Sequence, residues 1–342
     1  MAEAPHLPPM IGESQPFLDL MDRVSKVASL NRPVLVIGER GTGKELIASA
    51  LHFLSARWQG PFVQVNCAAL PETLIESELF GHEAGAFTGA VKQRPGRFEL
   101  ADGGSLFMDE IANATPEAQE KILRVVEYGV FERVGGDQSR RVDVRLVGAT
   151  NVDLPSAADA GRFRHDLLDR LAFDVLTVPP LRARQDDIPL LAHHFARAIA
   201  GELGWDGFPG FSRGAAGLLL DHGWPGNVRE LRNVVERTVY RHPDPGRPVE
   251  AIVFDPFDSP YRPAVAAAVD PGEASILTPA AAAAVSPDAR QPIDLRDAIS
   301  SVEKALLEQG LAATRFNQTA AAKHFGLTYH QLRNRLVKHG LI

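Results

Sequence analysis

A glycine-rich turn between an apolar run and a helical pattern constrains the fold of this chain most. Residues 34–37 are Val-Leu-Val-Ile, a continuous apolar run with the length and branching of a buried parallel strand. The turn that follows ends in a lysine and leads into a helical pattern at residues 46–54. In this order, backbone amides and the positive helix end surround phosphate groups, and the lysine reaches the outer phosphates. The predicted phosphate-binding loop consists of Gly38, Glu39, Arg40, Gly41, Thr42, Gly43, Lys44 and Glu45.

One position departs from the usual pattern of such a loop. A serine or threonine normally follows the lysine and supplies a magnesium ligand, whereas this chain has Glu45. A carboxylate can join a metal shell through water, but the sequence leaves the role of Glu45 open. Taken alone, the turn also fits a chance cluster of glycines, so a second element has to support the nucleotide site.

That second element is an apolar strand, residues 104–110, which ends in two carboxylates. Because successive strand residues point to opposite faces, the side chains of Asp109 and Glu110 diverge. We expect Asp109 to hold Mg²⁺ through its water shell and Glu110 to act as the general base on the attacking water. Together with the loop, this pair predicts in-line hydrolysis of a γ-phosphate.

A third apolar strand ends in Thr150 and Asn151. We expect this polar tip to lie beside the strand that precedes the phosphate-binding loop. There Asn151 can orient the attacking water or sense the γ-phosphate. The alternative is a simple strand-ending turn, which asparagine favours.

Strands and helical patterns alternate through the first half of the chain. Short strand patterns at 34–37, 62–65, 105–108 and 144–147 predict an open, mostly parallel sheet. From about residue 182 to 242 the patterns are helical only, which predicts a separate α-helical lid. Residues 255–292 contain seven prolines between alanine runs and predict a flexible linker, although the alanines also suit short helices. The predicted division is a tail at 1–10, an α/β ATPase subdomain at 11–180, a lid at 181–254, the linker at 255–292 and a C-terminal helical module at 293–342.

The charge of the chain is unevenly distributed. The net charge is −7, yet residues 313–342 hold five Lys or Arg and no acidic residue, which leaves −12 for the rest. A basic tip on an acidic body is expected when one small module contacts DNA, while a solvated basic helix face is the alternative. The single cysteine, Cys67, fits a reducing cytoplasm. No apolar run approaches the ~20 residues of a membrane span, and no secretory signal is present, so we expect a cytoplasmic protein without membrane insertion.

The pattern of the basic C-terminal region predicts a helix-turn-helix. Residues 317–327 predict the first helix and its turn, and residues 328–338 predict the recognition helix, with Leu332 and Leu336 toward the core. A small dimerising bundle is the alternative. The side chains that we expect to contact DNA are Thr328, Tyr329, His330, Gln331, Arg333, Asn334, Arg335 and Lys338.

Residues 85–90 place a Phe-Thr pair between two glycines. Glycine permits a tight, mobile loop tip, and an exposed phenylalanine is costly without a partner, so Phe87 is a candidate anchor for another protein. The alternative is a hairpin turn with Phe87 tucked inward. Residues 133–138 predict a second glycine-hinged loop. The full first segment is Gly85, Ala86, Phe87, Thr88, Gly89 and Ala90.

This segment resembles the GAFTGA signature of the AAA+ activators of sigma-54 RNA polymerase. The resemblance covers residues 10–242 and includes the motifs at 78–83, 179–182 and 224–231. It implies an AAA+ ATPase with a lid and a Fis-type DNA-binding domain. Such a protein binds enhancer DNA, forms a homohexamer and uses ATP to convert sigma-54 holoenzyme from the closed to the open promoter complex, with the 85–90 loop as the sigma-54 contact.

The resemblance also implies roles for single residues. Asn66 would hold Glu110 according to the state of the γ-phosphate. Arg164 and Arg170 would serve the neighbouring subunit as arginine fingers, and Arg229 would sense nucleotide within its own subunit. Each arginine also fits an ordinary structural ion pair.

Within the family, the chain resembles the branch that acts at phage-shock, or envelope stress, operons. About ten residues precede the ATPase region, so we expect no sensory domain in the chain. The resemblance then implies an inhibitory partner acting in trans, similar to phage shock protein A. Trp58 is either the exposed contact for that partner or a core residue.

Three other functions share parts of this pattern. A DNA-binding regulator that uses ATP only as an assembly switch would not need the 85–90 motif. A clamp- or helicase-loading remodeller would need neither that motif nor a helix-turn-helix. A small-molecule kinase shares the phosphate-binding loop but needs no arginine fingers and no DNA-binding module.

Overall fold

The structure is a computed structural model. The residues that the structure describes are 9–257, 261, 304, 306–308, 310–311, 314, 318–325, 327, 329–339 and 341. The chain divides into two compact units, Met1–Pro260 and Tyr261–Ile342. Most of the predicted tail and of the linker, and much of the beginning of the predicted C-terminal module, lie outside the described residues.

The first unit is built on a five-stranded parallel sheet with the order β2-β5-β8-β1-β9. The four predicted strands are confirmed, and β9 was not predicted because it contains only three residues. Side chains alternate along each strand, so Val34 and Val36 enter one core while Leu35 enters the other. The strands are β1 (Val34–Ile37), β2 (Phe62–Asn66), β5 (Ser105–Asp109), β8 (Arg145–Thr150) and β9 (Val175–Thr177).

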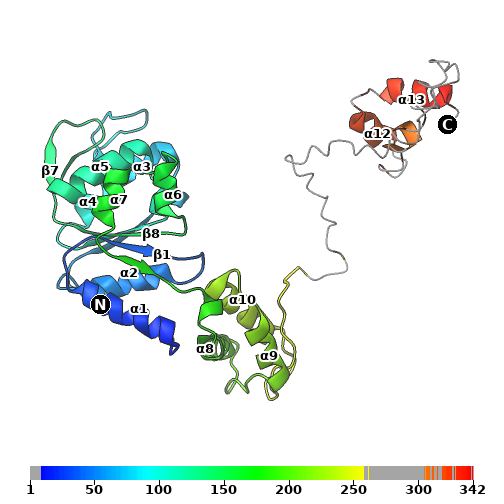
Figure 1. Cartoon of the computed structure of the whole chain (residues 1–342), viewed down its shortest axis with the longest axis horizontal. Coiled ribbons are helices and arrows are strands. Elements are labelled where there is room, and N and C mark those ends of the chain that lie inside the picture. Colours follow the sequence, from blue (N-terminus) through cyan, green and yellow to red (C-terminus); the bar gives the residue numbers. More distant parts are fainter. Residues whose placement is uncertain are drawn as a thin grey trace, which may run out of the picture. The chain divides into compact units, whose positions relative to one another are not determined.

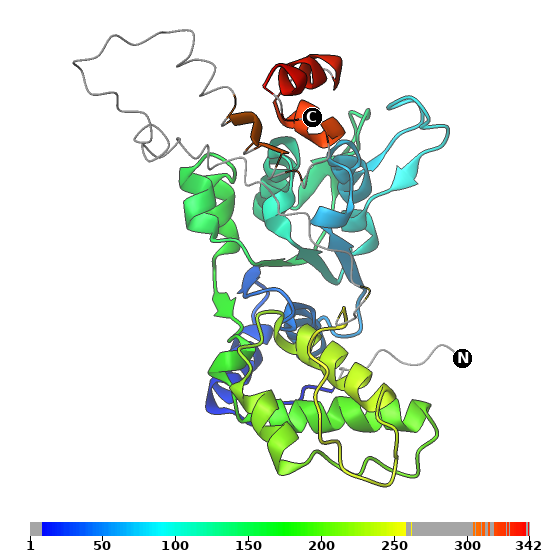
Figure 2. The same ribbon diagram turned by 90° about the vertical axis from the view of Figure 1, so that its right-hand side faces the viewer.

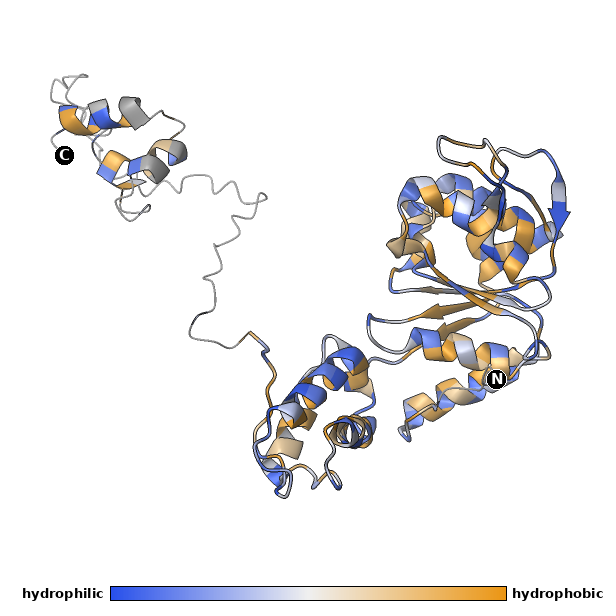
Figure 3. Ribbon diagram, turned by 180° about the vertical axis from the view of Figure 1, so that it is seen from behind, coloured by the Kyte–Doolittle hydropathy of each residue, from blue (hydrophilic) through white to orange (hydrophobic). Residues whose placement is uncertain are grey.

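Helices cover both faces of this sheet (Figure 1). One face carries α1 (Gln15–Ala28) and α2 (Lys44–Phe53). The other face carries α3 (Glu72–Phe80), α5 (Pro116–Tyr128), α6 (Leu154–Asp159) and α7 (His165–Leu171). The strands are largely apolar, and the helices turn apolar residues toward them and polar residues away (Figure 3). This layered arrangement brings the carboxyl ends of the parallel strands to one edge.

Two short hairpins extend the α/β subdomain at the end that faces away from the lid (Figures 1 and 2). The first pairs β3 (Gly81–His82) with β4 (Arg94–Pro95), and the second pairs β6 (Val130–Glu132) with β7 (Ser139–Arg141). The 85–90 loop lies within the first hairpin. Short helical segments connect the rest of the subdomain: η1 (Cys67–Ala69), α4 (Arg97–Leu100) and η2 (Ile111–Asn113).

The lid is a helical bundle, as predicted, and it packs around the fully buried Trp224. It begins with η3 (Leu181–Ala183) and continues with α8 (Asp187–Glu202), α9 (Arg213–Asp221) and α10 (Asn227–Tyr240). Asp187 ties the bundle to the start of α1, because it accepts hydrogen bonds from the Ser14 amide at 2.8 Å and the Ser14 hydroxyl at 2.8 Å.

The second unit contains α12 (Gln318–His324) and α13 (Tyr329–Lys338), in the two ranges where helices are predicted. Its core includes Leu332 and Leu336, both fully buried, as expected of a recognition helix that packs on its neighbours. Among the residues that the structure describes, no helix is long and apolar enough to cross a membrane.

Candidate functional site

The phosphate-binding loop lies at the carboxyl end of β1. The amide of Gly38 donates to the carbonyl of Thr150 (3.2 Å), and α2 starts at Lys44, so the free amides of its first turn face the loop. The Lys44 ammonium donates to the carbonyls of Gly38 (2.9 Å) and Glu39 (3.3 Å). Burial lowers the pKa of Lys44, and the charges of Glu110 and Asp109 oppose that shift. Glu45 is exposed in the first turn of α2.

The acid pair lies at the carboxyl end of β5, the second strand along from β1: Asp109 is the last residue of the strand and Glu110 follows it. Asn66 and Asp109 are register partners on neighbouring strands, and the Asn66 amide donates to Asp109 Oδ2 at 3.1 Å. The predicted hold of Asn66 on Glu110 depends on the state of the γ-phosphate and stays a prediction, whereas in this structure Asn66 contacts Asp109. The physical reason is the backbone: register partners present their side chains on the same side, whereas Glu110 turns away with a left-handed φ of 52°.

Glu110 instead meets Asn151 at the end of β8. With its amide oriented to satisfy both neighbours, Asn151 donates to Glu110 Oε2 (2.9 Å) and accepts from Arg40 Nε (3.2 Å). This contact supports the predicted location of Asn151 beside the phosphate-binding loop, since Ile37 and Thr150 are register partners. Thr150 itself is buried, and its hydroxyl accepts from the Val152 amide at 3.0 Å.

Asn227 joins the lid to the phosphate-binding loop and was missed from the sequence. Its amide nitrogen donates to Glu39 Oε2 (3.1 Å) and to the Arg40 carbonyl (3.0 Å), and its oxygen accepts from the Leu181 amide (2.8 Å). Arg182 pairs with the same glutamate, and hydrogen bonds from Arg182 and Asn227 lower the pKa of Glu39 to about 2. The one sequence feature that pointed to a role for Asn227 is its position within the 224–231 motif.

The backbone of the lid also closes on the loop. A methyl group added at Gly41 would lie 2.3 Å from the carbonyl oxygen of Gly226, and the amide of Arg229 donates to the Gly41 carbonyl at 3.3 Å. The Arg229 side chain is exposed, and its charge acts on Lys44 to lower the lysine pKa, a smaller effect than burial. Arg229 therefore lies beside the phosphate-binding loop, and its role as a nucleotide sensor stays a prediction.

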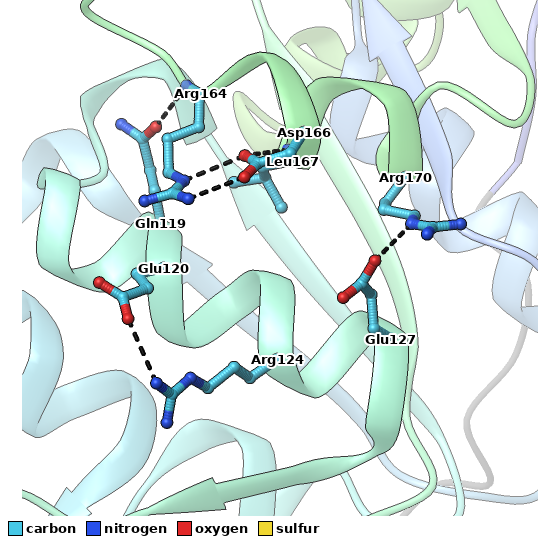
Figure 4. A network of polar contacts seen from close by, with 8 residues as sticks. All are labelled: Gln119, Glu120, Arg124, Glu127, Arg164, Asp166, Leu167 and Arg170. Carbon is cyan, nitrogen blue, oxygen red and sulfur yellow. Dashed lines mark hydrogen bonds and ion pairs between the residues drawn. The ribbon is translucent and has the colours of Figure 1, made fainter.

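Arg164 and Arg170 lie at the two ends of α7 (Figure 4). Arg164 forms a two-bond pair with Asp166 (2.7 and 3.0 Å), and Arg170 contacts Glu127 at 2.6 Å. Both guanidinium groups are exposed despite these pairs. Within the described part of the chain, the two guanidinium groups pair with Asp166 and Glu127 and not with Glu110. This arrangement fits both an ion pair and a finger for another subunit.

The 85–90 loop is closed at its base and open at its tip. The amide of Gly85 donates to the Ala90 carbonyl at 2.7 Å, and Gly85 and Gly89 have φ values of +85° and +105° that favour glycine. Phe87 is 39% exposed and lies edge-on to His82, with the ring centroids 5.0 Å apart. The inward-tucked alternative for Phe87 is therefore wrong.

The second loop supports the first. Arg133 is buried and bridges Glu99 at 2.7 Å and Glu83 at 3.1 Å, which joins the bases of the two hairpins. Gly135 approaches so closely that an added methyl group would lie 2.6 Å from Ala86 Cβ. The two loops therefore lie in close contact.

Two further predicted contacts lie on the surface. Trp58 is 50% exposed, so the core alternative for this residue is wrong. In α13, Arg333, Arg335 and Lys338 are exposed. Thr328 lies outside the described residues, as do the side chains of Tyr329, His330, Gln331 and Asn334.

Comparison with protein families divides the chain into three matches. A sigma-54 interaction domain covers residues 10–177, an AAA+ ATPase lid domain covers 182–251, and a bacterial regulatory protein domain of the Fis family covers 298–339. The geometry above, with a phosphate-binding loop, a lid and an exposed 85–90 loop, is consistent with these matches.

Characterised relatives agree with the family matches. The chain is 54% identical over 330 residues to the Psp operon transcriptional activator of Escherichia coli K12, covering 96% of this chain and 97% of that one. It is 54% identical over 236 residues to the Nif-specific regulatory protein of Azotobacter vinelandii, covering 69% of this chain and 45% of that longer protein. A crystal structure of NtrX from Brucella abortus in complex with ATP matches 97% of this chain and 70% of that one, with 33% identity and a TM-score of 0.66. The chain therefore belongs to the AAA+ sigma-54-dependent transcriptional activators, enhancer-binding proteins that use ATP to remodel sigma-54 holoenzyme.

Proposed function

We propose that this activator hydrolyses ATP between the subunits of a homohexamer and opens a phage-shock promoter. The observation that carries the proposal is the contact of Glu110 with Asn151 beside the phosphate-binding loop, within the same subdomain as the exposed 85–90 loop. Glu110 polarises the attacking water, and the hydrogen bond from Asn151 fixes the orientation of the Glu110 carboxylate. The Psp operon activator of Escherichia coli supports the choice of promoter.

Magnesium fits the donor set at this site. Mg²⁺ prefers oxygen ligands and is usually held by one or two carboxylates plus phosphates. Asp109 would hold it, with its Oδ2 kept in place by the Asn66 amide. The ion supplies charge neutralisation on the outer phosphates. Lys44, which faces the same two carboxylates, supplies a second positive charge to that region.

Completion of the site requires a second subunit. Within the described part of the chain, Arg40 and Arg229 carry the arginine charges that act on Lys44, whereas Arg164 and Arg170 are exposed on α7. We assign the latter two as fingers that stabilise the transition state in the neighbouring site, an effect worth about 10³–10⁵ in rate. Nucleotide state then moves the lid through Asn227 and the 85–90 loop through the hairpins.

The remaining partners follow from the surface. The exposed basic face of α13 binds enhancer DNA, and Thr88 beside Phe87 contacts sigma-54. Trp58, half-exposed beside the Arg57–Asp143 ion pair, is the contact for a phage shock protein A-like inhibitor. From these partners we infer that the protein acts in the cytoplasm.

The test of the hydrolytic site uses the purified full chain. Glu110→Ala and Glu110→Gln abolish ATP hydrolysis but leave ATP binding, because the phosphate-binding loop is unchanged. Glu117→Gln, an exposed carboxylate in the first turn of α5, is the matched control and retains activity. Wild-type turnover in Glu110→Ala would remove Glu110 from the role of base.

A further inference from the structure

Gln119 is a fully buried amide that uses both of its polar atoms. It lies in the first turns of α5 and is 1% exposed. Its Nε2 donates to the carbonyls of Ala114 (2.8 Å) and Arg162 (3.2 Å). Its Oε1 accepts from the amide of Arg164 at 2.9 Å (Figure 4). A single side chain therefore fixes three backbone groups from two segments.

The first of these segments begins at Glu110. The Asn113 amide donates to the Glu110 carbonyl (2.9 Å), and the Ala114 amide donates to the Ile111 carbonyl (3.0 Å), so residues 110–114 form one tight turn. Gln119 holds the last carbonyl of that turn. A shift of the Glu110 backbone is therefore transmitted to Gln119 through a short, hydrogen-bonded path.

The second segment carries Arg164. Phe163, next to it, is buried, while the Arg164 guanidinium lies at the surface on Asp166. The Arg164 backbone is thus anchored by Gln119 on the inside, and only its side chain is free to reorient. Loss of the Gln119 amide removes the acceptor for Arg164 N–H and a donor to the Arg162 carbonyl. The 162–164 segment then keeps the hydrogen bonds from the amides of Arg162 (2.9 Å) and Phe163 (3.2 Å) to the Ala157 carbonyl, and the Arg164 backbone loses its own anchor.

We propose that Gln119 is a positioning residue for catalysis in trans: it sets Arg164 for the neighbouring subunit and links that placement to the Glu110 turn of its own subunit. The inference rests on the proposed function, in which Arg164 serves the adjacent site. Displacement of a reacting group by 1 Å costs about 10²-fold in rate. Gln119 therefore acts on turnover in the next subunit and not on nucleotide binding in its own.

The test is subunit complementation with the full chain. Gln119→Leu keeps the volume and removes the amide. We expect kcat to fall about 10²-fold with an unchanged Kd for ATP. The second protein in the mixture is Lys44→Ala, whose own ATP site does not function but whose Arg164 is normal. We expect the mixture to hydrolyse ATP well above the sum of the two separate variants, because the ATP site of a Gln119→Leu subunit then receives a correctly placed Arg164 from a Lys44→Ala neighbour. Gln119→Asn, one methylene shorter, serves as the conservative variant and shows a smaller loss.

Two controls separate the inference from the function on which it rests. Arg164→Ala mixed with Lys44→Ala complements in the same way if Arg164 acts in trans, and failure of that pair overturns the finger assignment and the inference with it. If that pair complements and Gln119→Leu does not, or if Gln119→Leu turns over normally, the inference alone is wrong. Loss of ATP binding in both Gln119 variants would make the residue merely structural. Gln15→Leu, an exposed glutamine in α1, controls for the substitution and behaves as wild type.

Discussion

Replacing Gly135 by alanine tests whether the two loops act as one. Gly135 has a φ of +74°, and a Cβ built there lies 2.6 Å from Ala86 Cβ and 2.8 Å from Ala86 Cα. Ordinary contacts begin at 3.4 Å, so the two chains have to separate by 0.8 Å (3.4 − 2.6). Ala86 belongs to the 85–90 loop, whose tip carries the proposed sigma-54 contact.

The cost has two parts. A left-handed conformation costs a non-glycine residue about 1–2 kcal/mol. The separation strains the Glu83-to-Val134 hydrogen bond (3.1 Å), whose net worth is about 0.5–1.5 kcal/mol. A change of about 1.36 kcal/mol in a barrier changes the rate tenfold. Loss of the Glu83-to-Val134 hydrogen bond alone therefore predicts that the rate of promoter opening falls about two- to tenfold. ATP hydrolysis stays close to wild type, because Gly135 lies in the hairpin and not at the phosphate-binding loop.

A matched variant separates strain from steric clash. Gly204 has a φ of +73° and nothing within 4 Å of a built Cβ, so Gly204→Ala carries the same strain without the contact. Open-complex formation and ATP hydrolysis are measured for both variants. Promoter opening in Gly135→Ala equal to that in Gly204→Ala would refute the coupling of the two loops.

Three more predictions concern the lid and the sheet. Asn227→Ala removes two hydrogen bonds between the lid and the 38–45 loop and one within the lid, so ATP binding weakens at least tenfold in a fluorescent-nucleotide titration; an unchanged Kd would contradict the assignment. Glu39 has its pKa lowered to about 2 from 4.5 in the unfolded chain, so the stability advantage of wild type over Glu39→Gln is complete above pH 4.5 and declines as pH falls toward 2. Thermal melts across that range check the sign, and an advantage that grows on acidification would be inconsistent with it. The buried Arg145 donates to four backbone carbonyls at 2.8–3.3 Å, so Arg145→Met lowers the free energy of unfolding by about 3 kcal/mol or more in urea titration; a loss under about 1 kcal/mol would show that those carbonyls find other partners.

The sequence predicted what depends on local pattern. Four strands were recognised because each is a short run rich in apolar residues, and the phosphate-binding loop was recognised because its glycines and lysine lie close together in the sequence. β9 was missed because three residues carry too little pattern, and its pairing with β1 depends on distant sequence.

Contacts between distant residues were not predictable in the same way. Asn66 faces Asp109 and not Glu110 because strand register decides it, and register is a property of the assembled sheet. Asn227 and Glu39 are 188 residues apart, so their contact exists only once the lid has packed. Gln119 carried no sequence signal, because a buried glutamine is distinguished only by the backbone groups that surround it.

The most direct test of the central claim is ATP-dependent open-complex formation with purified sigma-54 holoenzyme, comparing wild type with Thr88→Ala. Wild type opens the promoter and Thr88→Ala does not, while both hydrolyse ATP at similar rates, because Thr88 lies at the exposed tip of the 85–90 loop. Normal promoter opening by Thr88→Ala would contradict the loop assignment. Absence of opening by either protein, with hydrolysis intact, would contradict the function itself.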